Sequence, residues 1–477
     1  MSASKISVRF APSPTGIMHL GNIRAALINY LFARQKQGTF IIRIEDTDAQ
    51  RNTDFEGRKI LSDLHWLHLS YDEGPDIGGP HAPYLQSQRS EFYQKHLKEL
   101  QTNNHVYRCF CTVEELEKKR QRQIALKMPP RYDRICTQLS NDAIEKKLAE
   151  HVPFIWRFKL PQGTVTVHDL ARGAMEYDLK NFSDFPLTRA DGSFTFVFAN
   201  FVDDLMMHIT HIFRGEEHLS STALQAALYQ TYRRDIPTFW HLPIICNSEG
   251  KKLSKRDFGF SLDDLKKDGL LPEAIINYLA IIGATFEQEV MSLDELVHAV
   301  NFEKQASAGF IHYDVEKLLW FNHKWIQRLH AEQIAERCRP LLQAHFPHAQ
   351  TTSTLELARI IQPLRDEFVT LNDCVEITRF YFEQPRIDKA ALENHMFTTY
   401  KPALQKLVAE YEKTANPDEF DAAMKLICKD LSLKPSHMFA LIRIALTGKP
   451  HGPSIIELLK ILSHEEVIAR LNALINA

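Results

Sequence analysis

A histidine stands where a predicted strand passes into a predicted helix, next to a loop rich in proline and glycine. The loop sequence FAPSPTGIMHLGN covers residues 10–22, and His19 falls where the helical spacing of apolar residues begins. The first turn of a helix has unpaired N–H groups and a positive dipole end, so this position suits an anion. Gly16 and Gly21 leave room for a phosphate or an adenine ring near the backbone. We therefore expect His19 to donate a hydrogen bond to a phosphate; the alternative is a surface loop without a chemical role.

A second group of charged residues lies in the loop NSEGKKLSKRDFG, residues 247–259. Its cations fall close together, at Lys251, Lys252, Lys255 and Arg256. Basic side chains on such a loop can close over a triphosphate and neutralise the charge that moves to departing pyrophosphate. Taken alone, the same run also fits a solvated basic turn, which is the commoner explanation of clustered charge.

The elements that must position these loops divide the chain into two halves. Up to about residue 260, helical stretches alternate with the strand-like runs KISVRF, TFIIRIED, VPFIWRFKL, GSFTFVF and FWHLPIICN. That alternation predicts an α/β fold. From residue 261 onward helical spacing prevails, with Ser261 as a predicted N-cap and a helix pair expected over 454–475.

Composition and charge exclude several classes of protein. A chain of 477 residues is too long for one core and predicts roughly two to four domains. A net charge of −3 gives no overall attraction to nucleic acid, so RNA binding would need a local patch. No apolar run approaches ~18 residues and no signal pattern is visible, so we expect no membrane contact. The seven cysteines are odd in number and mostly scattered, which indicates a reducing, cytoplasmic environment rather than a set of disulfides.

Together, the two loops resemble the paired signatures of class I aminoacyl-tRNA synthetases. PSPTGIMHLGN (12–22) resembles the HIGH signature, and KLSKR (252–256) resembles KMSKS, with Leu for Met and Arg for the final Ser. Further stretches are similar to the bacterial-type glutamyl-tRNA synthetase family: RIEDTD (43–48), DEGPDIGGPHAPYLQSQR (72–89), ITHIFRGEEHLSST (209–222) and LIRIALTGKPHGPSIIELLKIL (441–462). The resemblance covers essentially the whole chain, and its motifs are specific in combination.

The resemblance implies a Rossmann-type catalytic domain with an inserted acceptor-binding region, followed by an all-α anticodon-binding half. The implied division places the catalytic domain at 1–95 and 200–260, the inserted tRNA acceptor-binding region at 96–199, a helical stem-contact region at 261–330 and the anticodon-binding domain at 331–477. A monomer is the default expectation.

The resemblance also implies a two-step reaction that uses ATP as substrate. The α-carboxylate of glutamate attacks the α-phosphorus of ATP with Mg²⁺ assisting, and the terminal 2′-OH of tRNA(Glu) then takes the glutamyl group. This chemistry asks mainly for positioning and charge stabilisation, so we expect no covalent enzyme intermediate. The implied catalytic residues are His19, Lys252 and Lys255, and the implied ATP-binding residues are Thr15, Gly16, His19, Gly21, Asn22, Lys252 and Lys255.

Glutamate selection needs cations for the side-chain carboxylate and an acceptor for the ammonium group. The family pattern implies a glutamate-binding set of Arg9, Ala11, Ser13, Glu45, Phe196, Asn200 and Arg214. Guanidinium groups suit a carboxylate because they offer paired, planar donors and stay charged. The alternative for each residue is a structural ion pair or a turn position. Phe196 stands where many family members carry a tyrosine, which leaves the detail of the pocket open.

Three cysteines raise a separate question of metal binding. Cys109, Cys111 and Cys136 resemble a zinc knuckle of some family members, in which a histidine two residues after the third cysteine completes the set. Gln138 occupies that position here, and a neutral amide is a poor zinc ligand. The sequence leaves two alternatives. Asp133 or a distant histidine completes a zinc site, or the three cysteines are free thiols in a reduced protein.

Other functions also stay open at this level. A synthetase-like protein without catalysis would only hold RNA, and the intact His19, Lys252 and Lys255 argue against it. A nucleotidyltransferase shares the first loop signature, but such chains are usually short and lack a long helical half. A glutaminyl enzyme is a close variant whose anticodon region is expected to be β-rich, whereas residues 330–477 are predicted to be helical. Whether tRNA(Gln) is charged along with tRNA(Glu) does not follow from the sequence.

Overall fold

The computed structural model describes residues 5–47, 52–254, 256–302, 309–414 and 416–476. The chain forms two compact units, the first from 1–265 and 276–315 and the second from 266–275 and 316–477. Helices α8 (Leu262–Lys267) and α9 (Pro272–Ile281) contribute residues to both. In the described part of the chain, no helix has both the length and the apolar character that crossing a bilayer requires.

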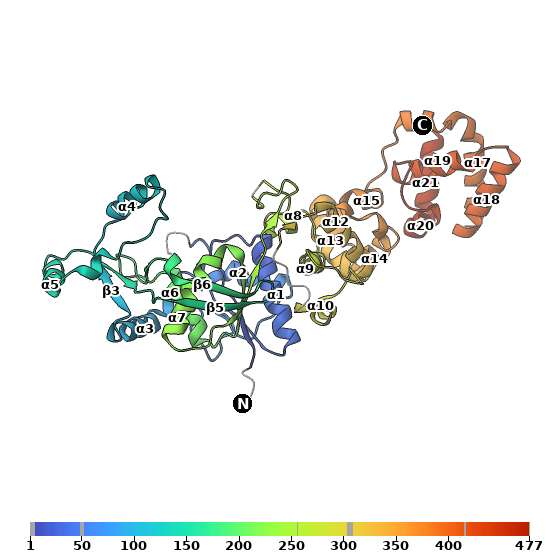
Figure 1. Cartoon of the computed structure of the whole chain (residues 1–477). Helices are drawn as coiled ribbons and strands as arrows, with labels where there is room; N and C mark the ends of the chain where they lie inside the picture. The colour runs from blue at the N-terminus through green and yellow to red at the C-terminus, as the bar shows by residue number, and fades with distance from the viewer. Residues whose placement is uncertain (1–4, 48–51, 255, 303–308, 415, 477) are drawn as a thin grey trace. The chain divides into compact units, whose positions relative to one another are not determined.

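The first unit is α/β (Figure 1). Its strands are β1 (Ser7–Phe10), β2 (Thr39–Ile42), β3 (Val106–Cys109), β4 (Ile155–Phe158), β5 (Thr164–Asp169), β6 (Gly173–Asp178), β7 (Phe185–Pro186), β8 (His211–Gly215), β9 (Thr238–Leu242), β10 (Ile245–Cys246) and β11 (Ile311–His312). Its helices besides α8 and α9 are α1 (Leu20–Gln35), α2 (Arg58–Trp66), α3 (Ser90–Thr102), α4 (Val113–Ala125), α5 (Asn141–Ala149), α6 (Phe196–Met206), α7 (Leu219–Thr231) and α10 (Leu293–Ala299). The strands form sheets ordered β1-β2, β10-β11, β3-β4-β7 and β6-β5-β9-β8.

Several strands of this unit pair in parallel. β1 and β2 pair in parallel, with Ser7 opposite Thr39, and α1 connects them in a βαβ arrangement. β8 and β9 also pair in parallel. The Thr210 N–H donates to the Ser7 carbonyl at 2.9 Å, which places the start of β1 beside the segment that enters β8. Because the carboxyl ends of parallel strands lie at one edge of a sheet, the residues after β1, β8 and β9 come together there, as in a Rossmann-type fold.

Several predicted elements are confirmed. The predicted strand before the first loop is β1, and α1 begins at Leu20, directly after His19. Ser261 caps α8, because its hydroxyl accepts a hydrogen bond from the Asp264 N–H at 3.2 Å. The helical run that follows breaks at Gly269, whose φ of +77° is the left-handed conformation that glycine tolerates.

One predicted strand is wrong. The run GSFTFVF alternates aromatic residues, yet its second half opens helix α6 rather than a strand. Thr195 is the residue before the helix, and Phe198, Phe201 and Val202 recur at helical spacing with 0% of their surface exposed. The alternation of Phe194, Phe196 and Phe198 therefore coincides with a helix start, and packing against the core decides the conformation.

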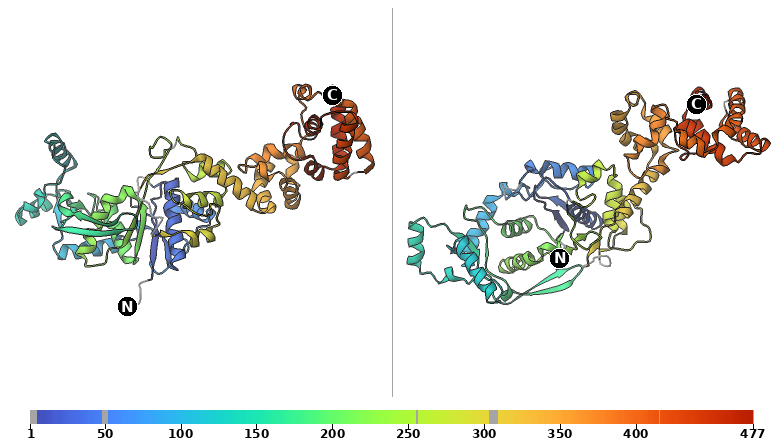
Figure 2. Two further views of the ribbon diagram at one scale, coloured as in Figure 1. Left: turned by 45° about the vertical axis from the view of Figure 1, so that its right-hand side comes forward. Right: turned by 90° about the horizontal axis from the view of Figure 1, so that it is seen from above.

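The second unit is helical in its described residues (Figure 2). Its helices are α12 (Val315–Arg328), α13 (Ala331–His345), α14 (Thr354–Ile361), α15 (Asp373–Phe382), α16 (Lys389–Asn394), α17 (Phe397–Thr414), α18 (Pro417–Asp430), α19 (Pro435–Thr447), α20 (Ile455–Ile461) and α21 (His464–Ile475). The last two are the predicted C-terminal pair. Each begins at a serine cap, since Ser454 and Ser463 accept hydrogen bonds from the N–H groups of Glu457 and Glu466.

Candidate active site

A cavity of about 450 Å³ lies in the first unit, where the loop after β1, the start of α1 and the residues after β8 and β9 meet. The predicted site residues on its wall are Arg9, Ala11, Ser13, Thr15, His19, Gly21, Asn22, Glu45, Phe196, Asn200, Arg214 and Lys252. Gly16 is not on this wall: its φ is +74°, and a Cβ there would lie 2.9 Å from Thr53 Oγ1, so it shapes the loop. Lys255 lies outside the described residues.

His19 is the N-cap of α1. Its Nδ1 accepts a hydrogen bond from the Asn22 N–H at 3.3 Å, and the Asn22 side chain accepts one from the His19 N–H at 3.4 Å. Burial lowers the pKa of His19, and the nearby Lys252 lowers it further, so the ring is neutral at pH 7. With Nδ1 accepting, the hydrogen-bond network puts the ring proton on Nε2. His19 is thus a neutral donor beside the unpaired N–H groups of the first helical turn.

Lys252 lies in the loop between β10 and α8 and forms part of the cavity wall while staying exposed. Asp257 stabilises this loop, because its carboxylate accepts from the N–H and hydroxyl of Ser254 at 2.8 and 2.9 Å. The neighbouring Lys251 instead forms an ion pair with Glu249 at 2.8 Å. Among the described cations of this loop, Lys252 is the one that lines the cavity.

Arg9 is paired within the protein. It is 3% exposed, and its Nε and Nη2 donate to the two carboxylate oxygens of Asp204 at 3.0 and 3.2 Å. Arg43 donates to the same carboxylate at 2.8 Å. Burial alone would raise the pKa of Asp204, but Arg9 and Arg43 outweigh it and hold that pKa below its usual value. Much of the positive charge of Arg9 is therefore already neutralised before any ligand binds.

Arg214 differs from Arg9 because its charge lacks such a partner. It is 7% exposed, and its Nη2 donates to Thr222 Oγ1 at 2.7 Å. Its Nε and Nη1 are buried without a hydrogen-bond acceptor among the described residues. Burial, together with the nearby Arg9, lowers the pKa of Arg214 to about 9, so it remains charged at pH 7. A buried guanidinium in this state favours an anionic ligand.

A chain of buried hydrogen bonds holds Arg214 in place. Thr222 Oγ1, the acceptor for Arg214, lies 2.7 Å from His241 Nε2, and His241 Nδ1 lies 2.7 Å from Asp169 Oδ2. Thr222, His241 and Asp169 are each 0% exposed. The three come from α7, β9 and β5, so the tertiary structure fixes the position of one edge of the Arg214 guanidinium.

Glu45 and Asn200 form a second hydrogen-bonded group on the wall. The Glu45 carboxylate accepts from Asn200 Nδ2 and from Arg43 Nη2. Asn200 Oδ1 in turn accepts from Gln225 Nε2 at 2.8 Å. Burial raises the pKa of Glu45, although Arg43 and Arg9 oppose this. Asn200 therefore orients Glu45, which is the carboxylate available to an ammonium group at this end of the cavity.

Phe196 stacks on His218. Their ring centroids are 5.4 Å apart with planes inclined by 30°, and both residues line the cavity. Burial and the nearby Arg214 lower the pKa of His218 to about 4, so this ring is neutral at pH 7. An apolar contact thus occupies the position where the resemblance leads one to expect a tyrosine hydroxyl.

The sequence analysis missed the residues that pair with the buried arginines of the site or hold them in position. Two aspartates, Asp203 and Asp204, follow one another inside the apolar run FANFVDDLM of α6. Asp203 accepts a hydrogen bond from Arg89. Two adjacent carboxylates in a buried helix signal ion pairs, because such groups are rarely buried unpaired. Thr222, His241 and Asp169 carried no such signal, since nothing in their spacing connects them.

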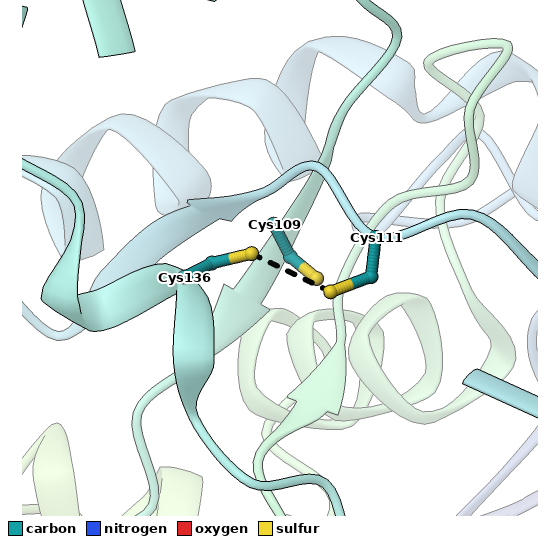
Figure 3. A group of neighbouring side chains, drawn as sticks. All are labelled: Cys109, Cys111 and Cys136. Carbon is teal, nitrogen blue, oxygen red and sulfur yellow. Dashed lines mark hydrogen bonds between the residues drawn. The ribbon is translucent and has the colours of Figure 1, made fainter. Parts of the chain in front are cut away.

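The side chains of the three cysteines come together (Figure 3), and none of them lines this cavity. The sulfur atoms of Cys109, Cys111 and Cys136 all lie within 4.8 Å of one another, and the last two are 3.6 Å apart. The Tyr132 hydroxyl lies 3.3 Å from Cys109 Sγ. Asp133, a candidate fourth ligand, pairs instead with Lys119 at 2.8 Å. The thiols suit zinc, but neither neighbour is a good fourth donor, because a phenol is not among the usual zinc ligands and Asp133 is engaged by Lys119.

Comparisons with known proteins agree with this architecture. Residues 5–320 match the family described as tRNA synthetases class I (E and Q), catalytic domain, and residues 333–475 match an anticodon binding domain. The chain is 36% identical to glutamate--tRNA ligase 2 of Syntrophus aciditrophicus (strain SB), covering 100% of this chain and 99% of that protein. It is 34% identical to glutamate--tRNA ligase of Bacillus subtilis (strain 168), covering 98% and 99%.

A solved structure is similar over the same length. It is the crystal structure of a glutamate tRNA ligase from Elizabethkingia meningosepticum in complex with its amino acid, with a TM-score of 0.90 and 31% identity. The match covers 99% of this chain and 100% of that one. The chain therefore belongs to the glutamate--tRNA ligase family of class I aminoacyl-tRNA synthetases.

Proposed function

We propose that this chain joins L-glutamate to tRNA(Glu) in the first-unit cavity, through a glutamyl-adenylate formed from ATP. One observation carries the proposal. A single cavity contains a histidine-capped helix N-terminus with an exposed lysine, and also a buried arginine without a counter-ion. The first group suits phosphates and the second suits a carboxylate, so the two substrates can lie side by side.

In the first step, the α-carboxylate of glutamate attacks the α-phosphorus of ATP, and the bond from that phosphorus to pyrophosphate breaks. His19 Nε2–H and the Lys252 ammonium would meet the negative charge that builds on the phosphates. Thr15, Gly21 and Asn22 complete the proposed ATP-binding wall. In the second step the terminal 2′-OH of the tRNA attacks the activated carbonyl carbon, and AMP leaves.

Mg²⁺ supplies charge neutralisation on the phosphates when it is bound. This ion prefers phosphate oxygens and water to a complete set of protein ligands. Glu217, an exposed carboxylate on the cavity wall, is placed to approach such a hydrated ion.

Glutamate would bind at the part of the cavity that contains the buried Arg214. Arg214 would pair with the side-chain carboxylate and Glu45 with the ammonium group, while Arg9 supports the first through its remaining edge. Ala11, Ser13 and Phe196 line the same wall, and Asn200 orients Glu45. A neutral glutamine amide would leave the Arg214 charge without its partner, which disfavours glutamine as substrate.

The remaining parts of the chain would serve the tRNA. We propose the inserted region 96–199 for the acceptor end, 261–330 for the stem and 331–477 for the anticodon. A cytoplasmic monomer completes the proposal; all seven cysteines are free thiols, which agrees with a reducing compartment.

Side-by-side charging tests the proposal. Purified tRNA(Glu) and tRNA(Gln) are each incubated with the full chain, ATP, Mg²⁺ and either labelled glutamate or labelled glutamine. We expect glutamyl-tRNA(Glu) and no glutaminyl product; formation of glutamyl-tRNA(Gln) would extend the substrate range. Failure to charge tRNA(Glu), or a preference for glutamine, would contradict the proposed function.

A further inference from the structure

A third buried arginine on the cavity wall, besides Arg9 and Arg214, belongs to no residue set considered so far. Arg24 lies on α1 and is 4% exposed. It lines the cavity together with Gly21 and Ala25, which are three residues before it and one after it. Residues at spacings of three and four share one helix face, so this face of α1 is turned to the cavity. Gly21 and Ala25 are small, so Arg24 is the charged side chain on that face.

Among the residues that the structure describes, no carboxylate pairs with Arg24. Its Nε and Nη1 are buried and have no hydrogen-bond acceptor among the described residues. Burial alone lowers the pKa of Arg24 to about 10, with no carboxylate contributing. The buried Arg9, Arg43 and Arg89 are different, since each donates to a carboxylate within 3.2 Å. A buried cation without a partner is energetically unfavourable, so an anion that binds in the cavity would be stabilised by pairing with it.

The position of Arg24 distinguishes between the anions that the cavity would receive. Arg24 and Gly21 both lie on α1 and both line the cavity, and Gly21 belongs to the wall proposed for ATP. Arg214 lies on β8, among the residues proposed for glutamate. Arg24 follows Gly21 by about one helical turn, so it belongs to the N-terminal end of α1 that His19 caps. That end is the one proposed for the phosphates.

We propose that Arg24 is a phosphate-binding residue for the nucleotide, which rests on the proposed function of the cavity. Its planar fork of N–H groups can hold two phosphate oxygens of ATP, and its charge compensates the negative charge that accumulates in the first step. Arg24 thus adds an anion-binding group that neither loop signature includes.

The test replaces Arg24 in the full chain by methionine or by lysine. Aminoacylation of tRNA(Glu) gives the KM values for ATP, glutamate and tRNA, and competition gives the inhibition constant of adenosine, which has no phosphate. We expect Arg24→Met to raise the KM for ATP at least ~10-fold, with less than ~2-fold change for glutamate, tRNA and adenosine. Arg24→Lys keeps the charge but loses the fork, so it should be intermediate. Arg34→Met is the matched control, because Arg34 lies on the same helix but pairs with Asp72 on the surface.

Thermal unfolding gives an independent readout. Removing a buried charge that has no partner should leave the ligand-free Arg24→Met protein as stable as the wild type or more so. The extra stabilisation that ATP provides to the wild type should shrink. An unchanged KM for ATP, a selective rise for glutamate or tRNA, or clear destabilisation of the ligand-free protein with ATP affinity intact would each overturn the proposal. Absence of charging by the wild type would instead contradict the function of the cavity, so the two failures are distinguishable.

Discussion

At the scale of single residues, the contrast between Arg9 and Arg214 decides which cation is available to a substrate. Both are buried arginines on one wall, and the sequence offered both for the same carboxylate. Arg9 donates two hydrogen bonds to Asp204, whereas Arg214 keeps two nitrogens without an acceptor among the described residues. A charge that already has a partner gains less from a ligand than one that has none.

Arg214→Gln should therefore weaken glutamate binding selectively. We expect the KM for glutamate to rise by ~10²-fold, about 2.7 kcal/mol, with the KM for ATP little changed. Discrimination against glutamine should fall as well, because the unpaired cation that rejects an amide is gone. Steady-state aminoacylation with both amino acids measures this. A normal KM for glutamate in the folded variant would make Arg214 a structural residue and Arg9 the selecting cation.

The hydroxyl of Thr222 positions Arg214, since it accepts from Nη2 and contacts His241 within 2.7 Å. Thr222→Val removes this hydroxyl at nearly constant volume, and Thr222→Ser retains it. We expect the valine variant to raise the KM for glutamate by roughly 10-fold and the serine variant to stay near the wild type. If valine leaves the KM for glutamate unchanged, the chain from Asp169 to Arg214 does not position the cation.

The cysteine group should hold zinc poorly. Three thiols converge, but the neighbouring Tyr132 offers only a phenol, which is not among the usual zinc ligands, and Asp133 is engaged by Lys119. We expect less than one zinc per chain after dialysis, since a structural zinc site needs four good donors. Elemental analysis of the wild type and of Cys136→Ser checks this, with Cys246→Ser as the control. Stoichiometric zinc that disappears in Cys136→Ser alone would show that a fourth ligand exists.

At the scale of elements, the packing of β8 against α1 makes the first unit sensitive to acid. His211 on β8 contacts the ring of Phe32 on α1 at 4.7 Å between centroids, and its Nδ1 lies 3.0 Å from Thr210 Oγ1. Burial, together with Lys36, lowers the pKa of His211 to about 4. In the unfolded chain the ring titrates near 6.5.

Stability should therefore fall as the pH drops from about 6.5 to 4. In that window the unfolded state binds a proton that the folded state does not, so the free energy of unfolding rises with pH. His211→Phe should flatten this dependence, while His168→Thr, a change at an exposed position on β5, should not. Thermal unfolding from pH 4 to 7 measures the slopes. Equal slopes in His211→Phe and the wild type would contradict this assignment. A residual slope is expected because burial also lowers the pKa values of four other histidines of this unit: His19, His96, His218 and His241.

At the scale of the whole molecule, the second unit is more than the C-terminal part of the chain. Residues 266–275 belong to it, and Glu273 in α9 forms a bidentate ion pair with Arg337 in α13 at 2.6 and 2.9 Å. The Leu271 N–H also donates to Asn322 at 2.7 Å. A chain shortened before Arg337 therefore leaves Glu273 without its partner.

A chain that ends after residue 330 should bind ATP but charge tRNA poorly. We expect charging to fall by ~10²-fold or more, since the region proposed to contact the anticodon is missing, and the melting temperature to fall because Glu273 loses Arg337. Full-length Arg337→Met is the control: it removes the ion pair but keeps the rear half, so it should charge normally. Full charging by the shortened chain would show that residues 331–477 serve another role.

Much of this protein follows from its sequence alone. Local patterns determined the strand, loop and capped helix around His19, the serine-capped C-terminal helices and the α/β front half, because caps and periodicity act over a few residues. The same reasoning gave a wrong prediction for the short run GSFTFVF. Its alternation fits a strand, but packing against the core makes its second half the start of α6.

Only the tertiary structure decided which charged groups of the site are paired with one another. Arg9 and its partner Asp204 are 195 residues apart, and Thr222, His241 and Asp169 come from three separate elements. No spacing rule connects such residues, so the sequence could not distinguish the paired Arg9 from the unpaired Arg214 and Arg24. The fold makes that distinction, because burial determines what a charge costs and the arrangement of the chain determines which charges meet.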